Sequence, residues 1–296
     1  MTRTQANPEF TPPDASVIEA DVAAALGEDI GPGDATASLL GDAPDCAYLL
    51  CKEDCVVAGR PWFDATHRAL DPGVRIDWRC REGDHITKGT VIATLQGRNR
   101  ALVTAERASL NFLQTLSGTA TTTARYVAAV AGTGTRILDT RKTIPGLRQA
   151  QKYAVRVGGG LNHRMALYDA VMLKENHIRA FGSVAAAIER ARTLHPALPL
   201  IVEVETPEQL REALETGCTR VLIDDFDAES RREAVRIARE EFASRIPLEV
   251  SGGVDMTTIG EIAADGVDYI SIGGLTKHVR AIDLSMKLGP PPSTAR

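Results

Sequence analysis

The stretch LIVEVETPEQLREALETGCTRVLIDD, residues 200–225, contains one complete unit of strand, helix and strand. Apolar runs at 200–205 and 220–225 flank the helical segment TPEQLREALETG. Strands that are apolar along nearly their whole length are typical of parallel sheets, because such sheets are covered on both faces. The stretch therefore predicts an α/β fold built on a parallel sheet.

The same alternation continues on both sides of this unit. Helical stretches such as SVAAAIERARTL and AESRREAVRIAREEF separate the later strands. Six strands in this rhythm fit either a (β/α) barrel or a doubly wound sheet. The four further predicted strands are RILDT (136–140), AVMLK (170–174), PLEVSG (247–252) and YISIGG (269–274).

Polar residues and glycines collect where these strands end. A barrel brings all of its strand ends to one rim, whereas a doubly wound sheet spreads them along an edge. Cations, acids and glycine turns on one rim form a coherent site, which favours the barrel. The residues at the strand ends are Thr140, Arg141, Lys142, Lys174, Glu175, Glu203, Glu205, Asp224, Asp225, Ser251, Gly252, Gly253, Gly273 and Gly274.

The predicted rim is rich in groups that bind anions. Arg141, Lys142 and Lys174 supply positive charge, and the loop GGGLNHR (158–164) adds further cationic groups. Arginine captures carboxylate or phosphate through two parallel N–H groups, and lysine acts as a point charge. The glycine turns after the last two strands fit a phosphate, because their backbone N–H groups can approach it closely.

Two acids complete the predicted rim. Glu203 and Asp224 stand on neighbouring strands, where they could share a divalent cation or accept hydrogen bonds from ribose hydroxyls. The rim therefore predicts a polyanionic substrate with a phosphosugar part and a carboxylate-rich part. The alternatives are that the glycines form ordinary turns, that His163 is structural, and that the acids only pair with neighbouring cations.

The N-terminal third has a different pattern. Short strands and turns dominate residues 47–97. Before them, Ser16 to Leu26 is predicted to form a helix, with Ser16 and Glu19 as a capping box, followed by the loop EDIGPGDAT (28–36).

After these strands, TAERASLNFLQTLSG predicts a helix that begins at Thr104 and stops at Gly118, and a second helix is predicted to reach about Val130. The predicted organisation is a disordered lead over 1–16, an α/β sandwich domain over 17–117 completed by about 277–296, and a barrel domain over 118–276 that carries the site.

Composition excludes several classes of protein. Charged residues make up 25% of the 296 residues, the hydrophobic set makes up 44%, and the formal net charge is −5. These values argue against a disordered chain and against a general nucleic-acid binder. No apolar run is long enough to span a membrane, and the polar start lacks a signal-peptide core, so a cytoplasmic location is predicted. The five cysteines are interpreted as reduced packing residues.

Several long motifs resemble one family, quinolinate phosphoribosyltransferase, also called carboxylating nicotinate-nucleotide pyrophosphorylase, of NAD biosynthesis. The resemblance runs from EDIGPGDAT to LTKHVRAIDLSM. It implies a sandwich domain joined to an open, incomplete (β/α) barrel, which works as a dimer or an assembly of dimers. Its most specific stretches are TAERASLNFLQTLSG, LDTRKTIPGLRQAQKYAVRVGGGLNHRMALYDAVMLKENHI, VEVET, LEVSGGV and DYISIGGLTKH.

The resemblance implies a role for each rim residue and for Arg107, which would reach into the partner subunit's site. Glu203 and Asp224 would hold the ribose hydroxyls and the Mg²⁺ side of phosphoribosyl pyrophosphate, with no organic cofactor. Lys142 and Lys174 join these acids as the catalytic set. The carboxylates of quinolinate would meet Arg141, His163, Arg164 and Lys174, with Lys142 nearby. The 5′-phosphate would meet Ser251, Gly252, Gly253, Gly273 and Gly274. Thr140 and Ser271 would also contact substrate.

Two departures from the family pattern stand at the rim. The chain has Asp225 where the family commonly has asparagine, and Gly274 where it commonly has alanine. The first adds an acid beside the metal side; the second keeps the backbone donors. The alternative functions are a pyrophosphorylase-like relative associated with molybdenum transport, a decarboxylating nucleotide enzyme on a related barrel, and a catalytically silent ligand sensor on the same fold.

Overall fold

The computed structural model describes residues 10–292, and these form two compact units. The described part of the first unit comprises residues 10–124, 143–159 and 275–292, and the second comprises 125–142 and 160–274. Residues 143–159, which the sequence placed in the barrel domain, thus pack with the first unit. Most of the predicted disordered lead, residues 1–9, lies outside the described residues.

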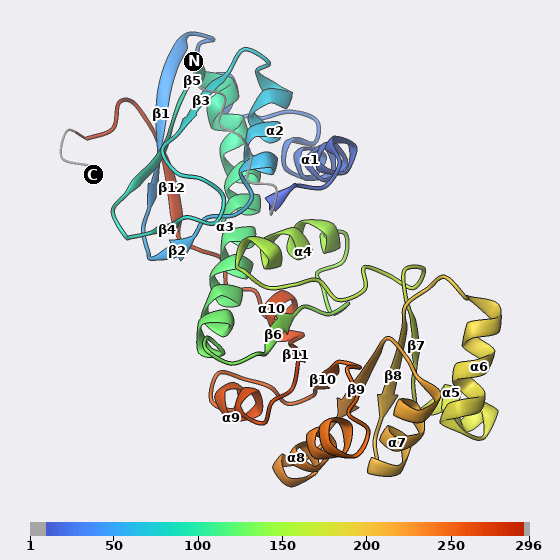
Figure 1. Ribbon diagram of the computed structural model, residues 1–296. Helices are drawn as coiled ribbons and strands as arrows, with labels where there is room; N and C mark the ends of the chain where they lie inside the picture. The colour runs from blue at the N-terminus through green and yellow to red at the C-terminus, as the bar shows by residue number, and fades with distance from the viewer. Residues whose placement is uncertain (1–9, 293–296) are drawn as a thin grey trace. The chain divides into compact units, whose positions relative to one another are not determined.

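The first unit is built on a four-stranded antiparallel sheet in the order β12-β1-β5-β3 (Figure 1). The C-terminal strand β12 pairs with β1, so the last residues of the chain complete the sheet of the N-terminal part. A small two-stranded sheet, β2 with β4, lies in the same unit. The strands are β1 (Pro44–Cys51), β2 (Cys55–Val56), β3 (Arg75–Trp78), β4 (His85–Ile86), β5 (Val91–Arg98) and β12 (Leu284–Leu288).

Helices cover this sheet and enclose two apolar clusters. One cluster joins Phe63 and Leu113 to the sheet residues Leu49 and Leu95, and the other surrounds Trp62. Cys51, Cys55 and Cys80 are buried in the first cluster. The helical segments are α1 (Ala15–Ile30), η2 (Ala37–Leu39), α2 (Arg60–Leu70), α3 (Asn99–Ala129), α4 (Arg148–Val157) and α10 (Gly274–Lys277), of which Gly274 belongs to the second unit.

The start and end of α1 differ from the prediction. Asp14 is the N-cap residue, directly after two prolines, and it makes no side-chain capping hydrogen bond. The predicted capping box of Ser16 and Glu19 is therefore wrong, because Ser16 already lies inside the first turn. The helix also runs to Ile30, into the predicted loop.

The predicted break at Gly118 is also wrong, since α3 is one continuous helix of 31 residues. Gly118 is buried inside this helix and serves a close approach of two backbones. A Cβ at this position would collide with the backbone carbonyl of Arg280 and would lie 3.4 Å from the Cα of Ala281. The close contact with Arg280 therefore requires glycine at position 118. The helix continues through this position because a single glycine lowers helix stability without ending the helix.

The second unit is a six-stranded, all-parallel sheet in the order β6-β11-β10-β9-β8-β7. The first strand, β6, pairs with the last, β11, as strands of a closed barrel do, but β6 and β7 do not pair. This order confirms the open, incomplete barrel. In a doubly wound sheet, the order of the strands would instead reverse at a point inside the sheet, and the first strand would not pair with the last. The strands are β6 (Arg136–Leu138), β7 (Val171–Leu173), β8 (Leu200–Val204), β9 (Arg220–Asp224), β10 (Leu248–Ser251) and β11 (Tyr269–Ser271).

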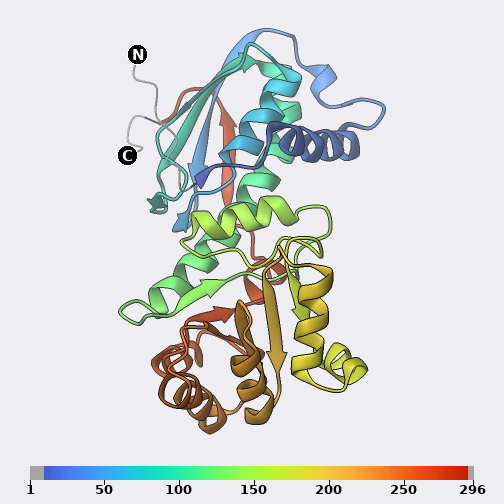
Figure 2. The same cartoon turned by 45° about the vertical axis from the view of Figure 1, so that its right-hand side comes forward.

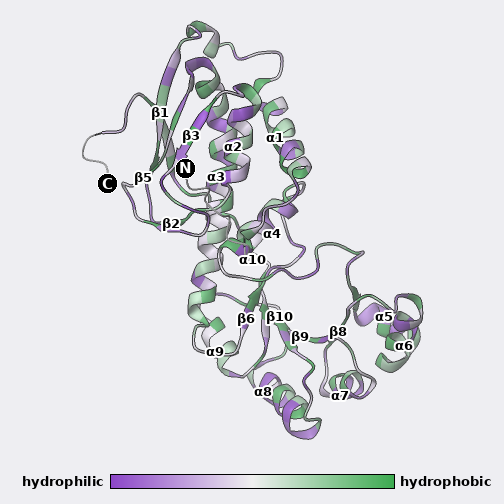
Figure 3. Cartoon of the chain, turned by 45° about the horizontal axis from the view of Figure 1, so that its top comes forward, coloured by the Kyte–Doolittle hydropathy of each residue, from purple (hydrophilic) through white to green (hydrophobic). Residues whose placement is uncertain are grey.

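Helices lie along the outer side of this sheet (Figure 2). Helix α8 is mainly hydrophilic, as expected for a helix with a wide solvent face (Figure 3). Among residues 10–292, no helix combines the length and apolar character needed to cross a membrane. The helices of this unit are α5 (Glu175–Phe181), α6 (Val184–Leu194), α7 (Pro207–Thr216), α8 (Ala228–Arg236), the π-helical turn η3 (Ile237–Glu241) and α9 (Ile259–Ala264).

The close approach at Gly118 predicts the effect of one methyl group. We expect Gly118→Ala to lower the free energy of unfolding by about 1–3 kcal/mol, the usual cost of overpacking. Gly27 is the matched control, because it lies inside α1 and a Cβ there would meet no neighbouring atom within 4 Å. Gly27→Ala should stabilise by about 0.5–1 kcal/mol through helix propensity. Urea denaturation of both variants measures the difference, and equal stabilisation would contradict the packing argument.

Candidate active site

Strand alternation aims the predicted rim residues at one face of the parallel sheet. Successive side chains of a strand point to opposite faces. In the register, Glu203 lies beside Leu222, and Asp224, two residues later, lies beside Ser251. Glu203, Asp224 and Ser251 therefore share the face opposite to the one that bears the buried Val202 and Ile223.

Acids and lysines meet at the ends of β8 and β9. Lys174 Nζ lies 2.7 Å from Oε2 of Glu203, whose side chain is 8% exposed. Burial raises the pKa of Asp224, and the negative charges of Glu203 and Asp225 raise it further. The positive charges of Lys174 and Lys142 act in the opposite direction. This end of the site therefore concentrates negative charge that its own lysines only partly offset.

Two glycines leave room for charged side chains at the rim. Gly252 has a φ of +94°, and a Cβ there would collide with the carboxylate of Asp225, itself at a φ of +53°. Asp225 thus lies against the glycine turn after β10 and adds to the charge beside Asp224. At Gly273 a Cβ would lie 2.8 Å from Cδ of Lys142, so the lysine stem passes over this glycine.

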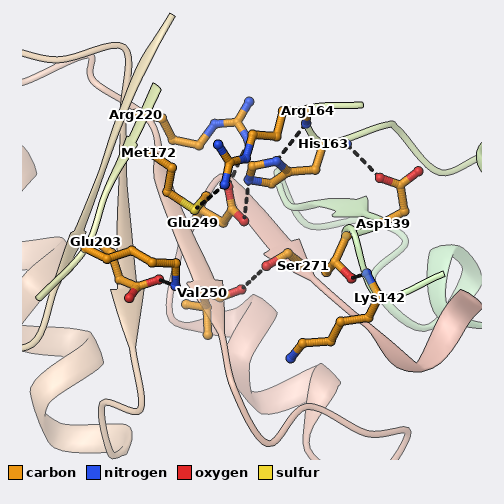
Figure 4. Close-up of polar contacts among 12 residues, drawn as sticks. Asp139, Lys142, His163, Arg164, Met172, Glu203, Arg220, Glu249, Val250 and Ser271 are labelled. Carbon is orange, nitrogen blue, oxygen red and sulfur yellow. Dashed lines mark hydrogen bonds and ion pairs between the residues drawn. The ribbon is translucent and has the colours of Figure 1, made fainter. Parts of the chain in front are cut away.

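Two guanidinium groups form a second charged cluster, near the start of β7. The Arg164 guanidinium donates to the carbonyl oxygen of Ala170 at 3.1 Å and to Met172 Sδ at 3.7 Å (Figure 4). Burial lowers the pKa of Arg164, and the positive charge of Arg141 lowers it further, while Asp169 acts against both. Two guanidinium groups are therefore held close enough to repel each other, which an anion between them would relieve.

The loop that carries Arg164 is held by Asp139, at the end of β6. One carboxylate oxygen of Asp139 accepts the backbone N–H of His163 at 2.9 Å, and the other accepts the Asn162 amide at 2.6 Å. Nδ1 of His163 accepts the backbone N–H of Arg164 at 2.7 Å. These contacts fix the backbone on both sides of His163, while the Arg164 guanidinium itself lies against the first half of β7, below the strand ends.

Further polar contacts of predicted site residues lie near the ends of the strands. Thr140 Oγ1 accepts the backbone N–H of Lys142 at 3.0 Å, and Ser271 Oγ donates to the carbonyl of Val250 at 3.4 Å. Arg107 is exposed on α3 of the first unit, so its contact with a substrate stays a prediction. The roles of the remaining rim residues also stay predictions: Thr140, Arg141, Lys142, His163, Arg164, Lys174, Glu203, Asp224, Ser251, Gly252, Gly253, Ser271, Gly273 and Gly274.

Sequence reasoning missed three charged residues beneath the rim. Asp139 and Glu249 are completely buried, and Arg220 pairs with Glu249 at 2.8 Å. Glu249 interrupts the apolar run PLEVSG at a position two residues before Ser251. A charge at such a position faces the same side as the rim residues, and this alternation was the signal that could have identified it.

An open (β/α) barrel whose rim combines arginines, lysines, acids and glycine turns defines a class of barrel enzyme for polyanionic substrates. Comparison with known proteins gives the family. The quinolinate phosphoribosyl transferase C-terminal domain matches residues 119–287, and the N-terminal domain of the same family matches residues 34–117. The chain belongs to the quinolinate phosphoribosyltransferase family.

Individual relatives cover most of the chain. The nicotinate-nucleotide pyrophosphorylase [carboxylating] of Mycobacterium leprae is 43% identical over 81% of this chain and 85% of its own length. The quinolinate phosphoribosyltransferase [decarboxylating] 2 of Nicotiana glauca is 40% identical over 89% of this chain and 80% of its own. The solved nicotinate-nucleotide pyrophosphorylase of Francisella tularensis has 40% identity and a TM-score of 0.91, covering 96% of this chain and all of that one.

The acid cluster predicts a pKa change. Asp225→Asn removes one negative charge beside Asp224, so the raised pKa of Asp224 should move down towards its usual range. The control is Glu229→Gln, which removes an exposed charge on α8 and should leave the pKa of Asp224 unchanged. Carbon-detected NMR titration of the Asp224 carboxyl measures both variants.

The raised pKa of Asp224 also makes the free energy of unfolding depend on pH. Because the folded-state pKa of Asp224 is above its unfolded value, the folded chain keeps the proton after the unfolded chain has lost it. The contribution of Asp224 to the free energy of unfolding therefore falls as pH rises through that window. The fall should be smaller in Asp225→Asn, and an unchanged Asp224 titration in this variant would contradict the proposed coupling.

Proposed function

We propose that this chain transfers the phosphoribosyl group of 5-phosphoribosyl 1-pyrophosphate to quinolinate and decarboxylates the product to nicotinate mononucleotide, a step of NAD biosynthesis. The observation that carries the proposal is the pair of half-buried guanidinium groups, Arg141 and Arg164, in the same barrel as the acids Glu203 and Asp224. The two arginines suit a dicarboxylate, and the two acids suit the ribose hydroxyls and the metal ion of a phosphosugar.

The chemistry requires positioning and charge more than a nucleophilic side chain. The pyridine nitrogen forms a bond to the anomeric carbon as the bond from that carbon to pyrophosphate breaks. The ring nitrogen becomes cationic, and its positive charge stabilises the electron pair left on the adjacent ring carbon when the carboxylate departs as carbon dioxide. A proton then binds that carbon in place of the carboxylate. Cations placed where charge develops lower both barriers.

The chain's own residues divide this work. Arg141 and Arg164 hold the carboxylates, and Lys174, whose Nζ lies 2.7 Å from Oε2 of Glu203, adds a cation beside the acids. Lys142, whose stem lies on Gly273, reaches towards Asp224 and can meet the departing pyrophosphate. The glycine turns after β10 and β11 present backbone N–H groups to the 5′-phosphate.

Magnesium fits the acidic side as an ion that arrives with the phosphosugar. No group of three or more histidine, cysteine, aspartate or glutamate side chains in residues 10–292 forms a complete metal site. Mg²⁺, however, commonly takes one or two carboxylates together with substrate phosphates and water. Glu203 and Asp224 would hold it, and the negative charge that raises the pKa of Asp224 favours a cation there. When bound, it neutralises charge on the leaving pyrophosphate.

The reaction is tested directly with purified protein, phosphoribosyl pyrophosphate and Mg²⁺. We expect quinolinate to yield nicotinate mononucleotide, pyrophosphate and carbon dioxide, because the cationic side is built for two carboxylates. Nicotinate, which lacks the second carboxylate, should be used poorly. Chromatography of the nucleotide product and release of labelled carbon dioxide measure the outcome.

This assay also separates the alternatives. The family match and the names of the relatives favour the quinolinate reaction over a molybdenum-associated relative or a silent sensor. Equal turnover of quinolinate and nicotinate would contradict the proposal that the pocket binds a dicarboxylate. Binding of quinolinate without any turnover would favour the sensor.

We further propose that the enzyme is a homodimer in which Arg107 serves the partner's site. In support, Arg107 is an exposed cation on a helix of the first unit, whereas the other carboxylate-binding groups stand on the barrel rim. A two-fold dimer would make the exchange reciprocal, because the same patch then serves both subunits.

Complementation tests the shared site. Arg107→Ala and Lys174→Ala should each be nearly inactive as homodimers. In a mixed dimer, one site carries both lesions and the other carries neither. Re-equilibrated equal mixtures should regain about a quarter of wild-type activity, because half of the dimers are mixed and each has one intact site. Exchange shown by differently tagged subunits, without regained activity, would place Arg107 in its own chain's site or in none.

A further inference from the structure

An ion pair with one fully buried partner lies on the inner face of the barrel, beneath the rim. Glu249 of β10 is 0% exposed, and its Oε2 accepts a hydrogen bond from Nη1 of Arg220 at 2.8 Å. The Arg220 guanidinium in turn lies 4.5 Å from the centre of the Tyr269 ring. The second carboxylate oxygen, Oε1, lies 3.4 Å from Nε2 of His163 (Figure 4). Glu249 therefore stands between a cation below and an imidazole above.

Glu249 is charged in this setting. Burial by itself raises the pKa of its carboxyl, but the contacts with His163 and with the charged Arg220 outweigh burial and hold the pKa below its usual range. A charged carboxylate without accessible surface can only accept hydrogen bonds. It therefore requires a proton on whichever imidazole nitrogen faces it.

The contacts of His163 select the matching tautomer of its ring. Nδ1 accepts the backbone N–H of Arg164 at 2.7 Å, so Nδ1 carries no proton. A neutral imidazole with a bare Nδ1 carries its proton on Nε2, which is the nitrogen that faces Glu249. The carboxylate on one side and the backbone N–H on the other thus favour the same tautomer.

The tautomer bears on the direction of Arg164. Its guanidinium is held at its far end by Ala170 and Met172, and its backbone is held by the His163 ring. A proton on Nδ1 would place two donors face to face, 2.7 Å apart, and would push the Arg164 backbone away from the ring. The loop would then lose one of the contacts that fix the Arg164 backbone.

We propose that Glu249 is a positioning residue for the carboxylate pocket: it holds His163 in the Nε2–H tautomer, and that ring holds Arg164 in the orientation that receives a carboxylate. The inference rests on the proposed quinolinate reaction for the identity of the carboxylate. Glu249 itself has no exposed surface with which to touch a substrate. Its effect on binding therefore passes through the imidazole.

Two double variants separate positioning from support of the fold. Both carry Arg220→Met, which removes the partly buried cation and so avoids an unpaired charge when Glu249 is changed. One adds Glu249→Gln, whose amide oxygen can turn to the Nε2 proton, and the other adds Glu249→Met, which has nearly the same shape but no comparable acceptor. The two proteins differ only in the hydrogen-bond acceptor beneath His163.

We expect the Gln double variant to keep a quinolinate KM close to that of the wild type. The Met double variant should show a KM about tenfold higher with a similar kcat, a factor that corresponds to about 1.4 kcal/mol. The KM for phosphoribosyl pyrophosphate should be unaffected in both. Thermal unfolding measured alongside shows whether the variants are folded to the same extent. Equal quinolinate KM values in the two folded double variants would overturn the proposal.

For the single variant Glu249→Gln, which keeps Arg220, we expect the opposite tautomer of the His163 ring. The guanidinium takes the amide oxygen, so the amide NH₂ faces His163 and favours a proton on Nδ1. Long-range ¹H–¹⁵N spectra of histidine-labelled protein report the tautomer, and His163→Gln assigns its signals among the six histidines. We expect Nε2–H in the wild type and in the Gln double variant, and Nδ1–H in the single variant.

These spectra need no turnover, so they test the positioning role even if quinolinate proves not to be the substrate. A wild-type His163 that carries its proton on Nδ1, or on both nitrogens at neutral pH, would overturn the proposal. Failure of the quinolinate assay with the expected Nε2–H signal would instead reject the proposed reaction and leave the role of Glu249 in holding the loop supported.

Discussion

The pairing of β6 with β11 is the contact on which the second unit depends, because it places the first strand of the sheet beside the last. Through it, the turn after β6 meets the glycine turn after β11, where the stem of Lys142 passes over Gly273. Parallel pairing then brings the same end of every strand to one rim. Residues far apart in the sequence become one site without any long connecting loop.

Charge at this rim is unbalanced on both sides. Negative groups crowd around Asp224, and positive groups crowd around Arg164, so burial and like charge shift the pKa of each towards its neutral form. The Lys174–Glu203 pair offsets only part of this imbalance. A polyanion with a dicarboxylate part and a metal-bearing part would complete both halves, which is the physical link between the fold and the proposed reaction.

The six parallel strands were predictable because each is a short apolar run with a polar end, and all six lie where the sequence predicts them. The errors fall at helix ends and at the division between the two units, where residues 143–159 pack with the first unit. Gly118 was interpreted as a stop from its local chemistry, whereas the backbone of Arg280, distant in sequence, requires glycine there. The capping box at Ser16 failed for a related reason, since the helix begins after the preceding prolines and Asp14.

The sequence by itself determined the fold class, the family and the set of charged residues at the strand ends, because periodicity and motif spacing are local properties. The tertiary structure alone decided which charges face each other. It placed Glu249 beneath His163 and aimed the Asp225 carboxylate at Gly252. Such contacts arise from strand register and loop packing, which join residues with no regular separation in the chain. The sequence shows that Glu249 interrupts an apolar strand, but only the tertiary structure shows that His163 lies against it.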